Sequence, residues 1–226
     1  MSVELRSPSV VPPFVSSVTV ALNAALVPTA DVPPELHRAA PSRQREYVAG
    51  RYCAARAIER LRPSDGPLTI GRGVAGEPQW PAGLTGSVTH TDGLASAAVA
   101  RISDARSIGI DSEVRVDAWR AERIRPLVMQ PEEEGVGGKA FDAGTRVIFI
   151  FSAKEAIFKC LYPVVSRRFY YEDARIISAD PTTGVFAAEL LTTLAPGFER
   201  GTVLQGRFEI DDRHVHTGVW LDPRQP

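Results

Sequence analysis

A chain of 226 residues, 44% of them apolar, is long enough to form one compact domain or two small packed lobes. Its formal net charge of −1 excludes a whole-molecule attraction to nucleic acid or to an anionic membrane, so any anion has to be bound at a local site. The two cysteines, Cys53 and Cys160, lie far apart in the sequence, which argues against a disulfide framework or a cysteine-based zinc site and favours the reducing cytoplasm.

An apolar stretch from Val10 to Val27 stands near the start of the chain. Pro12 and Pro13 interrupt this stretch, and no small-residue cleavage site stands out in it, so we expect neither a signal peptide nor a membrane span. We interpret the stretch as the first strand of a soluble protein.

The segment from Ser42 to Leu61 is predicted as a helix, which Pro63 stops. Arg43, Tyr47 and Arg51 recur one helical turn apart on this segment, so they share one face. Two arginines on one face of a helix are either a solubilising surface or part of an anion site.

Two alternating runs in GSVTHTDGLASAAVA, joined by Thr91 to Gly93, predict an antiparallel hairpin with a tight turn. His90 stands where the first strand of this hairpin ends. The following run, SIGIDSE, predicts a third strand that carries Asp111 and Glu113. Because alternate side chains of a strand point to the same side, these two carboxylates project from one face.

The second half of the chain is predicted to contain two helices and a small antiparallel sheet. One helix begins after Asp117 and runs towards Pro126, and a long buried helix begins at Asp142 or Thr145 and ends before Pro163. QPEEEGVGGKA, between them, is predicted as a polar loop, and four alternating runs from Arg168 onward predict the strands. Helix plus sheet therefore occurs twice, which predicts an α+β fold with a ligand cleft between two halves.

Asp111 and Glu113 repel each other and need a cation. Mg²⁺ accepts hard oxygen ligands and keeps positions for water and phosphate, and Glu155 on the long helix is the best candidate for a third carboxylate. Lys154 and Lys159, two of the three lysines in the chain, stand beside Glu155. Two extra ammonium groups indicate a second anion, most economically a polyphosphate that bridges the metal and the lysines.

Each of these features also has an ordinary structural interpretation. An isolated pair of acids on a strand is more often a solvated edge, and a Glu–Lys pair on a helix usually contributes only about 0.3–0.5 kcal/mol. His90 beside a turn is an ordinary exposed or capping residue on this interpretation. His214 and His216, which alternate on a late strand, are expected to do nothing chemical.

The ordered set AGRYCAARA, GEPQWPAGLTGSVTH, IGIDSE and FSAKEAIFKCLYP resembles the 4′-phosphopantetheinyl transferases. The resemblance is to the monomeric, double-lobed type represented by the enterobactin-synthase component and the surfactin-synthetase activator, and it runs from Arg43 to Pro163. It implies two pseudo-symmetric lobes, each a small antiparallel sheet packed with a long helix. Residues 1–112 would form the coenzyme A-binding lobe, and residues 113–226 would complete the metal site and dock the partner.

The resemblance implies transfer of the 4′-phosphopantetheine group of coenzyme A to a serine of an apo carrier protein, with release of adenosine 3′,5′-bisphosphate and with Mg²⁺ on the pyrophosphate. The implied metal ligands are Asp111, Glu113 and Glu155. The implied catalytic residues are Glu155 as general base, Lys159 and Lys154. The implied contacts to coenzyme A are Arg43, Arg51, Arg72, Ser87, Thr89, His90, Lys154 and Lys159.

The partners implied are acyl or peptidyl carrier proteins, or carrier domains of polyketide, nonribosomal peptide, siderophore or fatty acid synthases; neither nucleic acid nor membrane is expected. Such carriers present an acidic helix at the modified serine. The segment from Cys160 to Phe169 offers apolar and basic residues that would complement it: Leu161, Tyr162, Val164, Val165, Arg167 and Arg168. Core packing explains its apolar members equally well.

Two other classes of protein stay open. A Mg²⁺-dependent nuclease or phosphohydrolase also uses clustered acids with a lysine, but the chain lacks the basic stripe that a nucleic-acid backbone requires. A catalytically silent module that only binds coenzyme A is the second alternative, and the complete set of acids and lysines argues against it.

Overall fold

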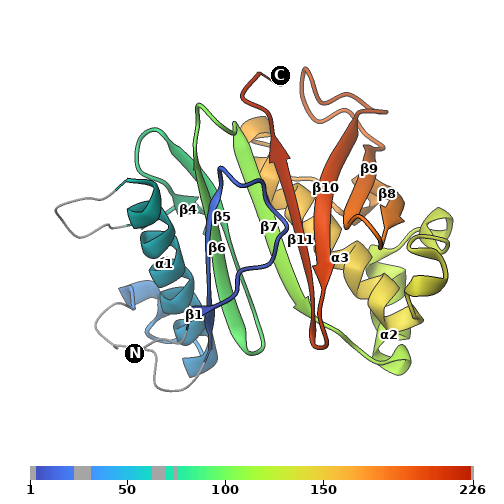
Figure 1. Ribbon diagram of the computed structural model, residues 1–226, viewed down its shortest axis with the longest axis horizontal. Helices are drawn as coiled ribbons and strands as arrows, with labels where there is room; N and C mark the ends of the chain where they lie inside the picture. The colour runs from blue at the N-terminus through green and yellow to red at the C-terminus, as the bar shows by residue number, and fades with distance from the viewer. Residues whose placement is uncertain (1–3, 23–31, 63–69, 74–75, 225–226) are drawn as a thin grey trace.

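The computed structural model describes residues 4–22, 32–62, 70–73 and 76–224. Two antiparallel sheets lie side by side, and each is packed against a long helix (Figure 1). This is the α+β architecture with two similar lobes that the sequence predicted. No helix in the described part of the chain has the length and apolarity that crossing a bilayer requires.

The first lobe contains a four-stranded sheet of order β1-β2-β6-β5 and the helix α1. Its strands are β1 (Glu4–Leu5), β2 (Ser16–Ala21), β5 (Leu84–Thr91) and β6 (Leu94–Arg101), with a separate small ribbon of β3 (Gly71–Arg72) and β4 (Pro78–Gln79). Helix α1 (Pro41–Leu61) follows the 3₁₀ turn η2 (Pro34–Leu36) and buries one face against β2 and β6. The helix and the sheet enclose a core that includes Val18, Ala57, Ile58 and Val99.

The predicted hairpin is confirmed as β5 and β6. Thr91 pairs with Leu94, which leaves a tight Asp92-Gly93 turn, and Gly93 has a φ of +90°. Side chains with a Cβ atom rarely adopt this left-handed conformation, so glycine is required there. Of the stretch predicted as the first strand, only Ser16–Ala21 form one, β2; the short β1 precedes it, and residues 10–15 are outside any strand. Residues 23–27 of the stretch lie outside the described residues.

The second lobe contains a five-stranded sheet of order β7-β11-β10-β9-β8. Its strands are β7 (Ser107–Val114), β8 (Ala174–Asp180), β9 (Val185–Leu190), β10 (Val203–Ile210) and β11 (His214–Leu221). Helix α3 (Ala143–Val165) packs against β7 and β11 and also contacts α2 (Ala118–Val128). Edge-to-face contacts of Phe149 with Phe141 and Phe186 lie in its core.

Side-chain caps begin both helices of the second lobe. Asp117 accepts a hydrogen bond from the Arg120 amide, and Asp142 accepts one from the Thr145 amide. Between these helices, the polar loop forms two 3₁₀ turns, η3 (Pro131–Glu133) and η4 (Gly138–Ala140).

Two predicted helix ends and one predicted strand start are corrected by the structure. Pro126 and Pro163 lie inside the last turn of their helices, and each helix ends two residues beyond its proline. A proline costs a helix one backbone hydrogen bond and disfavours its continuation, so it ends these helices shortly afterwards and not immediately before. The run that was predicted as a strand from Arg168 becomes one only at Ala174. Before it the chain forms the 3₁₀ turn η5 (Tyr171–Asp173), in which the Asp173 carboxylate accepts a hydrogen bond from the Tyr170 amide.

The lobes meet along a seam between β5 and β7. Strand β7 pairs with β11 over its whole length, so the boundary expected between residues 112 and 113 falls inside a strand of the second sheet. The other edge of β7 meets side chains of β5. The Ser87 hydroxyl accepts a hydrogen bond of 3.0 Å from the Ile110 amide, and the Thr89 hydroxyl accepts one of 3.1 Å from the Ser112 amide. Side-chain hydroxyls thus take the place of a backbone ladder at this seam.

The segment between β1 and β2 crosses the opposite face of the sheets from α1 and α3, over β6, β7 and β11 (Figure 1). Val10 and Val15 pack there with Ala98 of β6 and Ile108 of β7. Residues of both lobes therefore share one small apolar cluster, which holds the two sheets together from behind the seam.

We expect Ser87→Ala to lower the free energy of unfolding by about 1–3 kcal/mol, because the buried Ile110 amide loses its acceptor. Urea denaturation monitored by circular dichroism measures this change. Ser103→Ala, the same chemical change in the exposed turn after β6, is the matched control and should alter stability little. Equal effects of the two substitutions would contradict the role assigned to the seam.

Candidate active site

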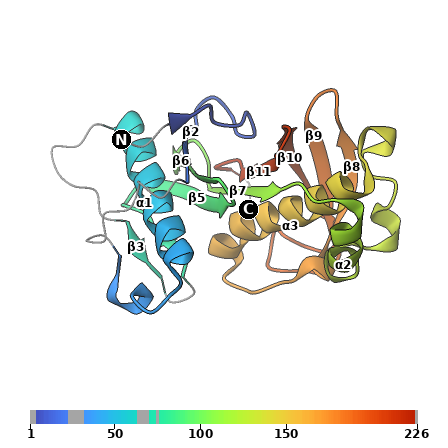
Figure 2. The same cartoon turned by 90° about the horizontal axis from the view of Figure 1, so that it is seen from below.

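A cleft of about 930 Å³ opens where the two lobes meet. Helices α1 and α3 flank β5 and β7 around the seam (Figure 2). Most of the residues predicted to form a site line this cleft. The first lobe contributes Arg43, Arg51, Arg72, Ser87, Thr89 and His90, and the second contributes Asp111, Glu113, Glu155 and Lys159.

Close approach of β7 to α3 brings the acidic residues of the second lobe together. A Cβ atom on Gly109 would lie 1.9 Å from the Ala156 carbonyl oxygen, so only glycine allows this spacing. One face of β7 then presents Asp111 and Glu113 to the same cleft as Glu155 on the helix. The glycine of the IGIDSE motif therefore has a packing role beside the acids.

Asp111 is buried and has one oxygen that is fully engaged. Its Oδ1 accepts hydrogen bonds from Lys159 Nζ at 2.7 Å and from the Thr89 hydroxyl at 3.2 Å, whereas its buried Oδ2 has no hydrogen-bond partner among the described residues. A buried carboxylate oxygen without a partner is costly. The second oxygen is thus suited to a cation.

Glu113 lies in an environment that disfavours its charge. Burial, followed by the charges of Asp111 and Glu155, raises its pKa to about 8, and Lys159 only partly opposes this shift. The three carboxylates therefore share one electrostatic environment with a single lysine in it. They are hard oxygen donors of the kind that Mg²⁺ accepts, although their ligand atoms do not all lie within 4.8 Å of one another.

Tyr171 holds the third carboxylate. Its phenol donates a short hydrogen bond to Glu155 Oε1, and burial together with this carboxylate raises the pKa of Tyr171. The Tyr171 ring also packs edge-to-face on Phe151 of α3. The sequence analysis missed Tyr171, because a tyrosine in a predicted strand carries no signal that it reaches a helix of the same lobe.

His90 lies at the basic end of the cleft, between Arg43 and Glu46. Arg43 Nη1 is 2.6 Å from His90 Nε2, and a guanidinium can only donate, so Nε2 is the unprotonated ring nitrogen. Its Nδ1 faces the Glu46 carboxylate at 3.5 Å. Burial is the main factor that lowers the pKa of His90, followed by Arg43 and Lys159. The ring is therefore neutral and fixed in orientation.

Arg51 is extended along the same wall. Its guanidinium lies 4.7 Å from the Tyr47 ring centroid, and its Nη2 donates to the Gly71 carbonyl at 3.1 Å. Its buried Nε has no hydrogen-bond partner in the described ranges. Arg72 enters from β3, with Nη1 4.0 Å from the Glu35 carboxylate. This wall therefore offers cationic donors to an anion.

Lys154 does not reach the cleft, which corrects the predicted phosphate contact. Its side chain is 2% exposed, and its Nζ donates to Glu133 Oε2 and to the Val128 carbonyl, both at 2.9 Å. Burial lowers the pKa of Lys154, and Glu133 opposes that shift. The cause is its position on α3, where it lies about 100° round the helix from Glu155 and faces α2 and η3.

Glu133 is the partner that the sequence analysis missed. It is completely buried, and besides Lys154 it accepts hydrogen bonds of 2.7 Å from the amides of Gln130 and Ile176. Nothing in the run PEEE distinguishes the glutamate that becomes buried from its two neighbours, because which of the three is buried depends on the fold. This buried ion pair joins η3, α3 and β8.

The predicted docking segment is divided between the core and the surface. Leu161 is fully buried in the core of the second lobe, so it is unavailable to a partner, which corrects that prediction. Tyr162 and Arg168 line the cleft, and Arg167 is exposed and donates to the Thr193 carbonyl.

The chain is similar in sequence to known proteins. Residues 32–100 match the model of the 4′-phosphopantetheinyl transferase N-terminal domain, and residues 107–215 match that of the 4′-phosphopantetheinyl transferase superfamily. The chain is 38% identical over 187 residues to 4′-phosphopantetheinyl transferase Svp of Streptomyces mobaraensis, covering 80% of this chain and 74% of Svp. It is 37% identical over 203 residues to 4′-phosphopantetheinyl transferase Npt of Nocardia iowensis, covering 83% of this chain and 87% of Npt. It is also 30% identical over 148 residues to enterobactin synthase component D of Salmonella typhi, covering 65% and 60% of the two chains.

The raised pKa of Glu113 predicts a pH-dependent effect of Glu113→Gln in metal-free protein. Because folding raises the pKa of Glu113 from its ordinary value of 4.5 to about 8, the wild type loses stability as pH rises between these values. We therefore expect the free energy of unfolding of Glu113→Gln to rise relative to that of the wild type by up to about 1.4 kcal/mol for each pH unit in this window. Urea denaturation in a chelator at pH 5, 7 and 9 measures the gain, and a difference that does not vary with pH would contradict it.

Proposed function

The chain belongs to the 4′-phosphopantetheinyl transferase superfamily, and from this premise we propose that the cleft between its two lobes is the active site. The enzyme transfers the 4′-phosphopantetheine group of coenzyme A to a serine of an apo carrier protein and releases adenosine 3′,5′-bisphosphate. The observation that carries the proposal is that one cleft is lined by three carboxylates and Lys159 from the second lobe and by arginines and a histidine from the first. A diphosphate with a terminal phosphate requires such a division of charge.

We assign the arginine wall to the 3′-phosphate of coenzyme A. This group is a terminal dianion that is bound and released unchanged, and a planar guanidinium binds such a group with two parallel hydrogen bonds. Arg51 supports the assignment through its unpartnered Nε, and Arg43, Arg72 and His90 line the same wall. Ser87 and Thr89 contribute to the binding of coenzyme A mainly by holding β7 in place, since their hydroxyls accept hydrogen bonds from backbone amides of β7.

Asp111, Glu113 and Glu155 are assigned as the residues that hold Mg²⁺. When bound, the ion neutralises negative charge on the pyrophosphate of coenzyme A. Lys159 adds a positive charge at the same end of the cleft, where its Nζ also lies 3.3 Å from the Ile110 carbonyl oxygen. Lys154 is reassigned from phosphate binding to positioning, because its ammonium group is buried against Glu133.

Glu155 is assigned as the general base. It takes the proton of the carrier serine, directly or through one water, as the serine oxygen forms a bond to the β-phosphorus. The bond between this phosphorus and the bridging oxygen breaks, and adenosine 3′,5′-bisphosphate leaves with that oxygen and its electron pair. Lys159 stabilises the charge that develops on the diphosphate. Tyr171 keeps the Glu155 carboxylate turned into the cleft through its hydrogen bond.

The two lobes divide this work in the proposal. The first binds coenzyme A, and the second, which begins at β7 rather than at residue 113, supplies the acids and docks the carrier. Arg167 and Arg168 are exposed beside the cleft and complement an acidic helix of an acyl or peptidyl carrier. Carrier domains of polyketide, nonribosomal peptide, siderophore or fatty acid synthases are the proposed partners, with the enzyme acting as a monomer in the cytoplasm.

The decisive experiment is intact-mass spectrometry of apo carrier proteins incubated with the enzyme, coenzyme A and Mg²⁺. The proposal expects the mass of one phosphopantetheine group to be added only when all components are present. A module that binds coenzyme A without a mass shift on any of a broad panel of carriers would contradict it. Cleavage of plasmid DNA would instead identify a nuclease.

Glu155→Gln should lower the rate of transfer by about 10²–10⁴-fold, because a glutamine cannot accept the serine proton. Circular dichroism should show an unchanged fold. Glu122→Gln, on the exposed surface of α2, is the matched control and should retain full activity. Normal turnover by the Glu155 variant would remove this residue from the role of base.

Arg51→Ala should raise the KM for coenzyme A by about 10- to 100-fold through loss of charged hydrogen bonds to the 3′-phosphate. The KM for dephospho-coenzyme A, which lacks that phosphate, should change little. Arg56→Ala is the matched control, because Arg56 is exposed on the same helix and pairs with Glu59. If both donors are affected equally by the Arg51 substitution, Arg51 does not bind the 3′-phosphate.

A further inference from the structure

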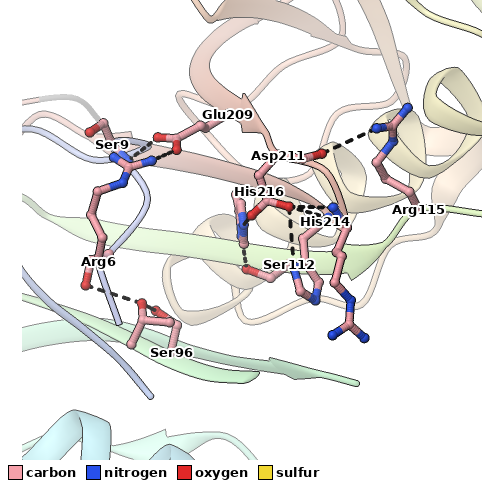
Figure 3. Close-up of polar contacts among 12 residues, drawn as sticks. Arg6, Ser9, Ser96, Ser112, Arg115, Glu209, Asp211, His214 and His216 are labelled. Atoms are coloured by element: carbon pink, nitrogen blue, oxygen red, sulfur yellow. Dashed lines mark hydrogen bonds and ion pairs between the residues drawn. The ribbon is translucent and has the colours of Figure 1, made fainter. Parts of the chain in front are cut away.

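Three side chains around the turn from β10 to β11 form a second cluster of metal-binding type. Asp211, His214 and His216 each offer a ligand atom, and these atoms lie within 4.8 Å of one another (Figure 3). Among the described residues, no other group of three histidine, cysteine, aspartate or glutamate side chains brings its ligand atoms this close together. The sequence analysis expected the two histidines to do nothing chemical.

The cluster is separate from the cleft. His216 stands opposite Ser112 in the pairing of β11 with β7, and its Nδ1 lies 2.8 Å from the Ser112 hydroxyl. Asp111 and Glu113, on either side of Ser112, point to the other face of β7 and line the cleft. The two groups of ligands therefore lie on opposite faces of one strand.

Two ligand separations in the cluster agree with tetrahedral coordination. His216 Nε2 lies 3.3 Å from Asp211 Oδ2, and His214 Nδ1 lies 3.6 Å from Asp211 Oδ1. Bonds of about 2.0–2.2 Å from Zn²⁺ to nitrogen and oxygen put tetrahedral ligand atoms about 3.3–3.6 Å apart. Each imidazole thus already lies at this spacing from one of the two Asp211 carboxylate oxygens.

The outer nitrogen of each histidine has a partner that fixes its ring. His214 Nε2 lies 3.1 Å from the Asp92 carbonyl oxygen, which can only accept, so Nε2 carries the proton. In the neutral ring this leaves the lone pair of Nδ1 directed towards the Asp211 carboxylate, an arrangement that a cation between them would stabilise. The Ser112 hydroxyl contacts His216 Nδ1 and orients its ring, and metal-binding histidines are usually held by such outer hydrogen bonds.

Asp211 is held rigidly while half of its side chain stays exposed. Its Oδ1 accepts hydrogen bonds of 2.7 Å from the amides of Arg213 and His214.

The nearby arginines are directed away from the ligand atoms. Arg115 donates to the Asp211 backbone carbonyl at 3.4 Å (Figure 3). Its other terminal nitrogen contacts Asp142 and Thr145. Arg213 extends towards the Asp92 carboxylate, 3.8 Å away. Both cations therefore leave the space between the carboxylate and the imidazoles free of a competing positive group.

We propose that Asp211, His214 and His216 bind a transition-metal ion of the Zn²⁺ class, with a water as the fourth ligand on the exposed side of Asp211. Two imidazoles and one carboxylate favour such an ion over Mg²⁺. Because His214 contacts Asp92 in the hairpin of the first lobe and His216 contacts Ser112 of β7, the ion would stabilise the junction of the two lobes. The proposal does not depend on the assigned catalytic roles.

The test is a titration of metal-free protein with Co²⁺ in excess Mg²⁺, followed by visible absorption. Asp111→Asn is used as the background, so that the cleft contributes no signal of its own. We expect one equivalent of Co²⁺ with the strong visible bands of tetrahedral coordination, and displacement of that signal by Zn²⁺. Zn²⁺ should also raise the Tm of the wild type.

Asp211→Asn should weaken Co²⁺ affinity at least tenfold and abolish the Zn²⁺-dependent rise in Tm. An asparagine oxygen can still accept from the amides of Arg213 and His214, so the turn should keep its fold. His214→Gln is the second variant and should show the same loss. His37→Gln, which removes a histidine far from the cluster, is the matched control and should bind as the wild type does.

Absence of one-equivalent Co²⁺ binding by the wild type would overturn the proposal. Unchanged binding by both the Asp211 and the His214 variants would also overturn it. Transfer to the carrier is measured in parallel: failure of that reaction with intact Co²⁺ binding contradicts only the proposed function, and the reverse result contradicts only the second metal site.

Discussion

The position of the active site depends on how one edge of β7 meets β5. A backbone ladder would have joined the two sheets continuously, but here the amides of β7 bond to the hydroxyls of Ser87 and Thr89. Each buried amide would cost about 1–3 kcal/mol if left without an acceptor, so these hydroxyls are required wherever the ladder is absent. The Thr89 hydroxyl also donates to Asp111. One small side chain therefore satisfies the backbone of the second lobe and orients the central carboxylate of the cleft.

The charges of the cleft are arranged for a ligand and are unfavourable without one. Three carboxylates lie near a single lysine, and the resulting repulsion and burial are visible in the raised pKa of Glu113. Arginine donors line the same cleft from the first lobe, among them Arg51, whose buried Nε has no partner among the described residues. Acids for a metal ion and cations for phosphate together suit a ligand that carries both a diphosphate and a terminal phosphate. The buried Lys154–Glu133 pair lies outside this arrangement and contributes to the rigidity of α3, from which Glu155 and Lys159 project.

Local patterns in the sequence predicted the elements that carry the acids. Period-two alternation places Asp111 and Glu113 on one face of β7, and capping by Asp117 and Asp142 fixes where two helices begin. Contacts between residues far apart in the sequence could not be predicted in this way. The direction of Lys154 depends on which of three neighbouring glutamates is buried, and the contact of Tyr171 with Glu155 depends on how the turn after α3 folds back. The boundary of the lobes was misplaced because pairing of β7 with β11 joins segments about a hundred residues apart, beyond any local signal.

Ser112 links the two faces of β7. Its amide donates to Thr89 on the side of the seam, while its hydroxyl contacts His216 in the cluster of Asp211, His214 and His216. Its neighbours Asp111 and Glu113 face the cleft, so the strand that supplies two proposed Mg²⁺ ligands is also fixed from behind by an imidazole. An ion bound behind β7 would hold His216, and through Ser112 it would restrict the movement of this strand against β5. The second site would thus act on the stability of the seam and not on the chemistry of the cleft, because its ligands do not reach the face on which the substrate lies.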